Sequence, residues 1–200
     1  SLVLTGARPV FLTPEWNEEW KIFQGISLAT LEKAMIQYPE AKGLFLISPT
    51  YYGVSGELEK LIEKAHQKDL VVLLDEAHGV HLPFLKKPLP HGVSSGADGV
   101  AQSAHKFLGA FTGASWLQIQ GKRLLPEKIH QSFLALQTSS PNYPLLASLD
   151  GARRQMGVAG KALWGPIEEM ADELRQRINQ ITGLACLTEE EIRPFLFDPC

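Results

Sequence analysis

Cysteine is nearly absent from the sequence, with only Cys186 and Cys200 among 200 residues. Two cysteines are too few for a disulfide scaffold or for a structural zinc site. An excess of positive charge is also absent, because 19 basic residues face 22 acidic ones and the net charge is −3. We therefore expect no nucleic-acid partner, which needs a clustered basic surface. No apolar run approaches the roughly 18 residues of a transmembrane helix, so we expect no membrane partner.

A secretory leader, with its basic, apolar and small-residue regions, is also missing, and the first residue is not Met. The last residues, Phe197–Cys200, come directly after an apolar stretch, whereas natural domains usually end in polar tails. These features predict a reduced, cytoplasmic protein of which this chain is a fragment. A chosen expression boundary is the alternative explanation.

Short apolar runs alternate with amphipathic segments along the first half of the chain. Residues 28–37 carry apolar side chains at helical spacing behind Ser27, and a second such helix follows Gly56. The apolar runs at 43–48, 70–74 and 99–102 are typical of parallel strands, the first two of them continuous enough for burial on both faces. This order predicts an α/β fold with a mostly parallel sheet and helices on both faces.

The remaining segments are less regular. The Pro- and Gly-rich stretch 82–96 indicates a surface loop, and the apolar residues at the N-terminus indicate the inside of a strand. A further strand is expected at 113–119, and helices are expected near residues 122–136, 144–156 and 161–182.

Two residues that suit cofactor chemistry follow two of the predicted strands. Ligands bind outside the carboxyl ends of parallel strands, which is where Asp75 and Lys106 stand, 31 residues apart. A lysine held in a crevice can form a Schiff base, and a carboxylate in the same site is a natural partner for a pyridinium nitrogen. Ser103 lies three residues before Lys106 and could bind a phosphate. An Asp at a strand end can also simply cap a turn.

Five sequence stretches carry a resemblance to a known family. The sets Asp75-Glu76-Ala77-His78 and Ser103-Ala104-His105-Lys106 resemble fold-type-I pyridoxal-phosphate enzymes. Residues 4–10, 48–53 and 137–150 are similar to the Orn/Lys/Arg decarboxylase family in its shorter bacterial form. The resemblance covers nearly the whole chain and implies the large domain of a pyridoxal-phosphate-dependent transferase-like fold, here incomplete.

The resemblance implies roles for eight residues. The catalytic ones are Lys106, which would hold pyridoxal 5′-phosphate as a Schiff base, Asp75, which would keep the pyridine nitrogen protonated, and His105. Either Lys106 or His105 would return a proton to the substrate Cα. The other cofactor contacts would be Ala77 on one ring face, His78 at the 3′ oxygen, Ser103 and His105 at the phosphate, and Thr138 and Ser139 at the neighbouring subunit's cofactor.

The same resemblance implies an activity and an organisation. A small amino acid, arginine, lysine or ornithine, would be decarboxylated to a polyamine precursor, with arginine favoured because the shorter family members are often so assigned. A homodimer or higher homo-oligomer is expected. Residues 1–160 would be a partial cofactor-binding large domain, and residues 161–200 a linking helix and the start of a truncated C-terminal domain. The family's phosphate-binding turn and ring-stacking His would precede residue 1, so we expect the isolated chain to be inactive.

Several alternatives stay open at this point. Transamination or aldol cleavage by another fold-type-I enzyme would use the same Asp75 and Lys106, and an inactive fragment could serve only as an interaction domain. The letters Asp-Glu-Ala-His also occur in helicases, but the required phosphate-binding loop of the Walker A type is missing. A metal site from Asp75, Glu76 and three histidines, His78, His81 and His105, is a weaker possibility.

Overall fold

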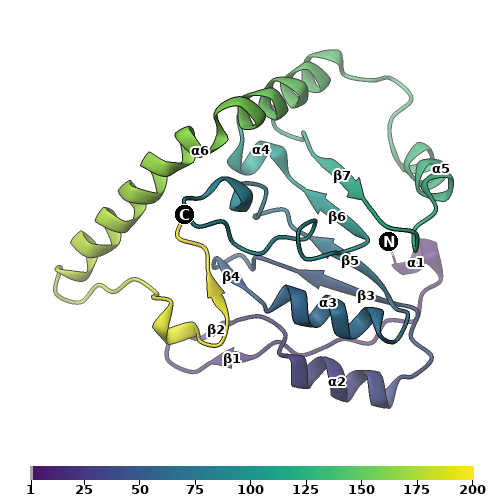
Figure 1. Cartoon of the computed structure of the whole chain (residues 1–200), viewed down its shortest axis with the longest axis horizontal. Coiled ribbons are helices and arrows are strands. Elements are labelled where there is room, and N and C mark those ends of the chain that lie inside the picture. The colour runs from purple at the N-terminus through teal and green to yellow at the C-terminus, as the bar shows by residue number, and fades with distance from the viewer. Residues whose placement is uncertain (1) are drawn as a thin grey trace.

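A four-stranded sheet forms the centre of the protein (Figure 1). The computed structural model describes residues 2–200. The strands, in the order β3-β5-β6-β7, are β3 (Gly43–Ile47), β5 (Val71–Asp75), β6 (Gly99–Gln102) and β7 (Trp116–Ile119). The first three are parallel and β7 is antiparallel to β6, so the prediction of an α/β fold with a mostly parallel sheet is confirmed.

Two helices, α2 (Leu28–Gln37) and α3 (Leu58–His66), supply the core on one side of the sheet. The Ser27 hydroxyl accepts a hydrogen bond from the Thr30 N–H and begins α2, as the sequence predicts. On α3 the buried residues recur at the spacing of one helical face. They pack against alternate residues of the strands, and the main members of this core are Leu58, Leu61, Ile62, Ala65, Leu44, Leu46, Val72, Leu74 and Val100.

The opposite side of the sheet is more open. Phe45 and Ile47 of β3 are each 63% exposed, and Leu73 of β5 is 38% exposed. The expected burial of these strands on both faces is therefore not met among the described residues, where the two strands alternate between buried and exposed positions. Helix α5 (Pro126–Leu136) approaches this side at Leu117, with which it lines a small cavity.

Shorter elements connect the two ends of the chain to this core. Strand β4 (Val54–Ser55) pairs with β8 (Leu196–Phe197), and β1 (Trp16–Asn17) pairs with β2 (Ile22–Phe23). Single helical turns lie at η1 (Leu82–Phe84) and η2 (Glu190–Ile192). Residues Leu2–Thr5 form a short exposed helix, α1, so the predicted N-terminal strand is wrong, and this segment pairs with none of the strands described in residues 2–200.

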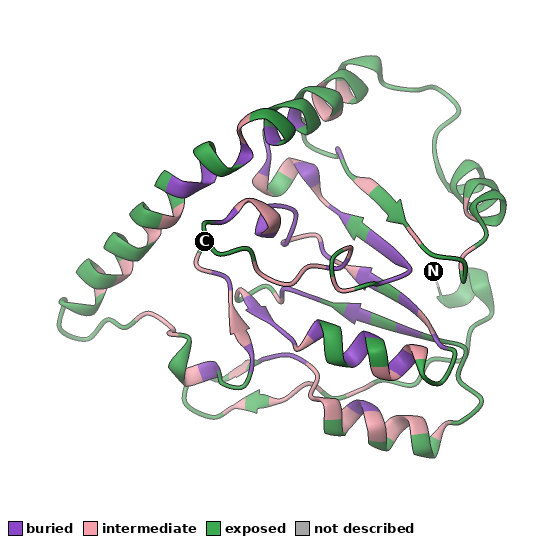
Figure 2. Ribbon diagram, viewed as in Figure 1, coloured by how far each residue is buried: buried purple, intermediate pink, exposed green. Residues whose placement is uncertain are grey.

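One long helix, α6 (Tyr143–Asn179), runs past the carboxyl ends of the parallel strands (Figure 1). It joins the two helices expected at 144–156 and 161–182, and it continues through residues 157–160 between them. Its buried stripe packs on the loop of residues 80–89 and on α4 (Ala104–Phe107), and the stripe consists of Ala152, Met156, Gly160, Trp164 and Gly165 (Figure 2). A Cβ at Gly160 would overlap the Phe84 ring, so the glycine permits close packing there without ending the helix.

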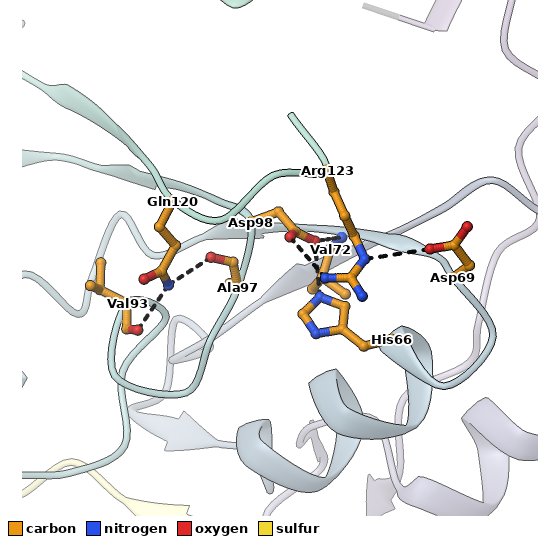
Figure 3. Close-up of polar contacts among 8 residues, drawn as sticks. All are labelled: His66, Asp69, Val72, Val93, Ala97, Asp98, Gln120 and Arg123. Carbon is orange, nitrogen blue, oxygen red and sulfur yellow. Dashed lines mark hydrogen bonds and ion pairs between the residues drawn. The ribbon is translucent and has the colours of Figure 1, made fainter. Parts of the chain in front are cut away.

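Asp98 ties together the amino ends of β5 and β6, opposite the end where Asp75 lies (Figure 3). Its buried carboxylate accepts the Val72 N–H at 2.8 Å and pairs with His66 of α3 at 2.9 Å. Arg123 lies 3.6 Å from the same carboxylate. None of the helices that the structure describes is long and apolar enough to cross a bilayer.

Candidate active site

Neighbouring strands bring Asp75 and Lys106 to the same end of the sheet. Asp75 is the last residue of β5 and lies opposite Ala101 of β6. Helix α4 begins two residues after β6 and carries Lys106 in its single turn. The expected arrangement, with both residues at adjacent strand ends, is therefore present.

Lys106 lies against His78, which follows β5. The Lys106 Nζ atom is 2.8 Å from the His78 Nε2 atom. Burial lowers the pKa of His78, the positive charge of Lys106 lowers it further, and Asp75 offsets part of this effect. The imidazole of His78 is thus held neutral, so that it can accept a hydrogen bond from the amine of Lys106.

The turn after β5 is fixed by Asp75 itself. Its Oδ1 atom accepts the Ala77 N–H at 3.0 Å, an arrangement common where an Asp begins a turn. Asp75 shares the open side of the sheet with Ile47, its partner in the β3 register. Asp75 can both cap this turn and bind a ligand, because its second carboxylate oxygen is not needed for the turn.

Ser103 and His105 surround Lys106 in sequence and in space. Ser103 is the N-cap of α4, its hydroxyl makes no capping bond, and its carbonyl accepts the Lys106 N–H at 3.2 Å. The His105 Nδ1 atom lies 2.8 Å from the Ala114 carbonyl oxygen and must donate to it. This bond fixes the tautomer, so the Nε2 atom of His105 carries a lone pair for another partner.

A cleft of about 560 Å³ opens beside Lys106 and His78. This size lies within the range of small-ligand sites. The Tyr51 ring meets the His78 ring edge-on at 5.5 Å between centroids. The other walls come from segments far apart in the sequence, and the lining also includes Thr50, Tyr52, Gly53, Phe107, Arg175, Phe197, Asp198 and Cys200.

The sequence indicated residues 48–53 as a candidate ligand-binding segment, because they follow a predicted strand. It did not indicate Phe107 or Arg175, which also line the cleft. Phe107 directly follows Lys106, so its position gave a usable signal. Arg175 looks like one of many exposed charges on a long helix, and no spacing rule marks it. It reaches the cleft because α6 passes beside β8, where its guanidinium lies 5.0 Å from the centre of the Phe197 ring.

Thr138 and Ser139 do not line this cleft. They lie exposed in the connection between α5 and α6, where the Thr138 hydroxyl accepts the Ser140 N–H. Their assignment to a neighbouring subunit's site remains a prediction.

The metal site considered from sequence does not form. Among residues 2–200 one group of side chains has ligand-like spacing, and it combines His81 with Asp198 and Cys200. The buried His81 ring pairs with Asp198 at 3.0 Å and stacks on Phe107 at 4.5 Å between centroids. Burial also raises the pKa of the Cys200 thiol to about 12, which opposes its use as a thiolate ligand.

Known proteins are similar to this chain along almost its whole length. The family model of the Orn/Lys/Arg decarboxylase major domain matches residues 1–198. The arginine decarboxylase of Halalkalibacterium halodurans is 39% identical over 100% of this chain and 41% of its own length. The arginine decarboxylase of Bacillus subtilis is 38% identical over 95% of this chain and 39% of its own length.

A solved structure shows the same fold. Lysine decarboxylase A from Pseudomonas aeruginosa superposes with a TM-score of 0.77 at 25% identity, over 90% of this chain and 27% of its own. The chain thus spans about two fifths of the length of the two arginine decarboxylases above. Because the family model covers almost every residue, the chain belongs to the Orn/Lys/Arg decarboxylase family.

Proposed function

We propose that this chain forms the pyridoxal-phosphate-binding part of a decarboxylase that acts on a basic amino acid, with arginine as the preferred substrate. The observation that carries the proposal is the Lys106 amine held 2.8 Å from a neutral His78, at the mouth of a cleft and beside the strand end of Asp75. The identity to curated arginine decarboxylases supports the choice of arginine.

The residues present suit the chemical groups of pyridoxal phosphate. Lys106 offers an amine for its aldehyde, and Asp75 offers a carboxylate for its ring nitrogen. Ser103 offers a hydroxyl that makes no capping bond, and His105 would offer an Nε2–H donor to its phosphate when the ring is protonated. When bound, the cofactor would supply the electron-accepting ring that stabilises the carbanion left by departing CO₂.

The chain's own residues would manage protons and orientation. The neutral His78 accepts a hydrogen bond from Lys106, which would orient the amine toward the cofactor's aldehyde. Asp75 would keep a proton on the ring nitrogen by its charge. Lys106 or His105 would return a proton to the substrate Cα.

The wider setting follows from the same proposal. The amine product would serve as a polyamine precursor, and the enzyme would work in the cytoplasm. A homodimer or larger homo-oligomer would bring Thr138 and Ser139 of one subunit to the cofactor of the next. Residues 1–160 would belong to the large domain and residues 161–200 would lead into a C-terminal domain.

The test is an assay of CO₂ release from arginine, lysine and ornithine with added pyridoxal phosphate. Because the relatives are longer than this chain, the assay uses the protein at its whole natural length. We expect release from arginine above the other two, and its loss in Lys106→Ala but not in Lys128→Ala, which changes a lysine of α5. Borohydride reduction and mass spectrometry should place the pyridoxyl group on Lys106. A pyridoxyl group on another lysine, or no release from any of the three, would refute the proposal.

A further inference from the structure

A carboxylate outside the cleft is buried directly behind the site. Glu76, the residue after Asp75, has 0% of its surface exposed. One of its oxygens accepts the Gly92 N–H at 2.6 Å, and the other accepts Nε2 of Gln102 at 2.5 Å. Gln102 in turn is the residue before Ser103. The hydrogen bond between Glu76 and Gln102 therefore joins the chain segments that carry Asp75 and Lys106.

The bonds continue from Gln102 to the antiparallel strand β7. The Oε1 atom of Gln102 accepts the Trp116 Nε1–H at 2.6 Å and also a hydrogen of the Gln118 amide. Donors on β7 therefore point to Gln102, and the donor of Gln102 points to Glu76. Every hydrogen bond in this series is thus donated toward Glu76. The side chain at position 76 must therefore accept two hydrogen bonds, from Gly92 and Gln102, and donate none.

This arrangement has an energetic cost. No Lys, Arg or His side chain forms an ion pair with Glu76 within residues 2–200, so the carboxylate is stabilised by neutral donors alone. Burial raises the pKa of Glu76 to about 7, although both hydrogen bonds act in the opposite direction. The turn also packs tightly on it, because a Cβ at Gly79 would lie 2.6 Å from the Glu76 Cγ atom.

A costly buried polar group that is fully hydrogen-bonded fixes one arrangement of the segments around it. Here those segments are the ends of β5 and β6 and the start of β7. We propose that Glu76 is a positioning residue, which sets Asp75 and Lys106 at the separation that pyridoxal phosphate requires. This inference rests on the proposed function and adds to it a residue that touches neither cofactor nor substrate.

The direction of the bonds provides a sharp test. In Glu76→Gln, every rotation of the two amides leaves two donors facing each other, at Gly92, at Trp116 or between the two amides themselves. In the double variant Glu76→Gln/Gln102→Glu, residue 76 accepts from Gly92 and donates to residue 102, which accepts from Trp116 and Gln118. Each donor regains an acceptor, and the negative charge moves from residue 76 to residue 102.

The experiment measures the dissociation constant of pyridoxal phosphate at pH 8, and the fraction trapped on Lys106 by borohydride, in the whole protein. We expect Glu76→Gln to weaken binding about tenfold and the double variant to return to within about threefold of the wild type. Asp98→Asn is the matched control, since it also disturbs a buried carboxylate but at the opposite strand ends. It should lower the unfolding free energy and leave the dissociation constant unchanged.

The outcomes separate the two proposals. A wild-type protein that traps no pyridoxal phosphate on Lys106 overturns the proposed function and this inference with it. A wild type that binds, together with a Glu76→Gln variant that binds equally well, overturns the inference alone. The inference is also overturned if the double variant is no better than Glu76→Gln, or if Asp98→Asn weakens binding as much.

Discussion

The Lys106 Nζ atom lies 2.8 Å from the Nε2 atom of His78, so a cation is placed directly against an imidazole. Lys106→Met should therefore raise the pKa of His78, because one of the two influences that lower it is removed. The rise should be partial, since burial is the larger cause. Titration of the His78 ring protons by NMR measures it, with Lys128→Met as control. An unchanged or lower pKa would contradict the contact.

Asp75→Asn should weaken pyridoxal phosphate binding while leaving the turn after β5 intact. Asn keeps the oxygen that accepts the Ala77 N–H but loses the charge that would hold a proton on the ring nitrogen. A charge-assisted hydrogen bond is worth about 1.5–3 kcal/mol, or roughly ten- to a hundredfold in affinity. CO₂ release should fall further, because the charge matters most as the carbanion develops. Asp69→Asn, at an exposed site, should behave as wild type, and near-normal turnover of Asp75→Asn would exclude the proposed role.

Glu76 should give the protein a pH-dependent stability. Its pKa is raised from 4.5 to about 7, so the folded state binds a proton more tightly than the unfolded state. The free energy of unfolding should therefore fall as the pH rises from about 4.5 through 7, by roughly 3 kcal/mol from this group. Urea unfolding of wild type and Glu76→Gln at several pH values gives the unfolding free energy of each protein as a function of pH. The difference between these two curves is the contribution of Glu76. Parallel curves would show that Glu76 does not titrate in this range.

Asp98→Ala should destabilise the fold without acting on the site. The change leaves the buried Val72 N–H without its acceptor, which costs about 1–3 kcal/mol. It also removes the partner of His66. Urea unfolding gives the loss in stability, and the affinity for pyridoxal phosphate gives the comparison. If the affinity for pyridoxal phosphate falls together with the unfolding free energy, Asp98 at the amino ends of the strands does influence the site at their carboxyl ends.

The open side of the sheet should make residues 1–200 self-associate when they are produced alone. Phe45 and Ile47 are neighbouring outward positions on β3, and large exposed apolar surfaces favour association. Phe45→Thr/Ile47→Thr places residues of high β-propensity at both positions and should reduce the associated fraction seen by sedimentation velocity. Ile36→Thr removes an isolated exposed side chain of α2 and should have little effect. Equal association in all three proteins would show that this surface is not responsible.

The four strands of the central sheet, helices α2 and α3 and the position of Asp75 and Lys106 at one end of the sheet could be predicted from sequence, because they follow from local periodicity and from the rule for parallel strands. Helix α3 shows this well, since the four apolar residues of its predicted face are its buried ones. Ser27 likewise marks the start of α2 by a local hydrogen bond.

The rest depends on contacts between distant segments. Whether the second face of β3 is buried depends on which segments pack against the sheet. A continuous apolar run in the sequence does not identify those segments. The run Leu2–Thr5 is helical and exposed, and whether an apolar run pairs as a strand depends on the segments beside it. Helix α6 continues where two helices were expected, and Gly160 within it packs against Phe84 from another loop. The role of Glu76 depends on Gln102 and Gly92, which are 26 and 16 residues away.

The proline within α6 has a mechanical consequence for the cleft. Pro166 cannot donate a backbone hydrogen bond, so the helix is most easily bent there. Before it, Trp164 is buried beside the His81 ring, and after it, Arg175 forms part of the opposite cleft wall. Nine residues at 1.5 Å each separate Pro166 from Arg175, roughly 14 Å, so a change of about 10° in the bend moves the guanidinium by about 2 Å. The position of Arg175 in the wall of the cleft that contains Lys106 therefore depends on the helix angle at Pro166.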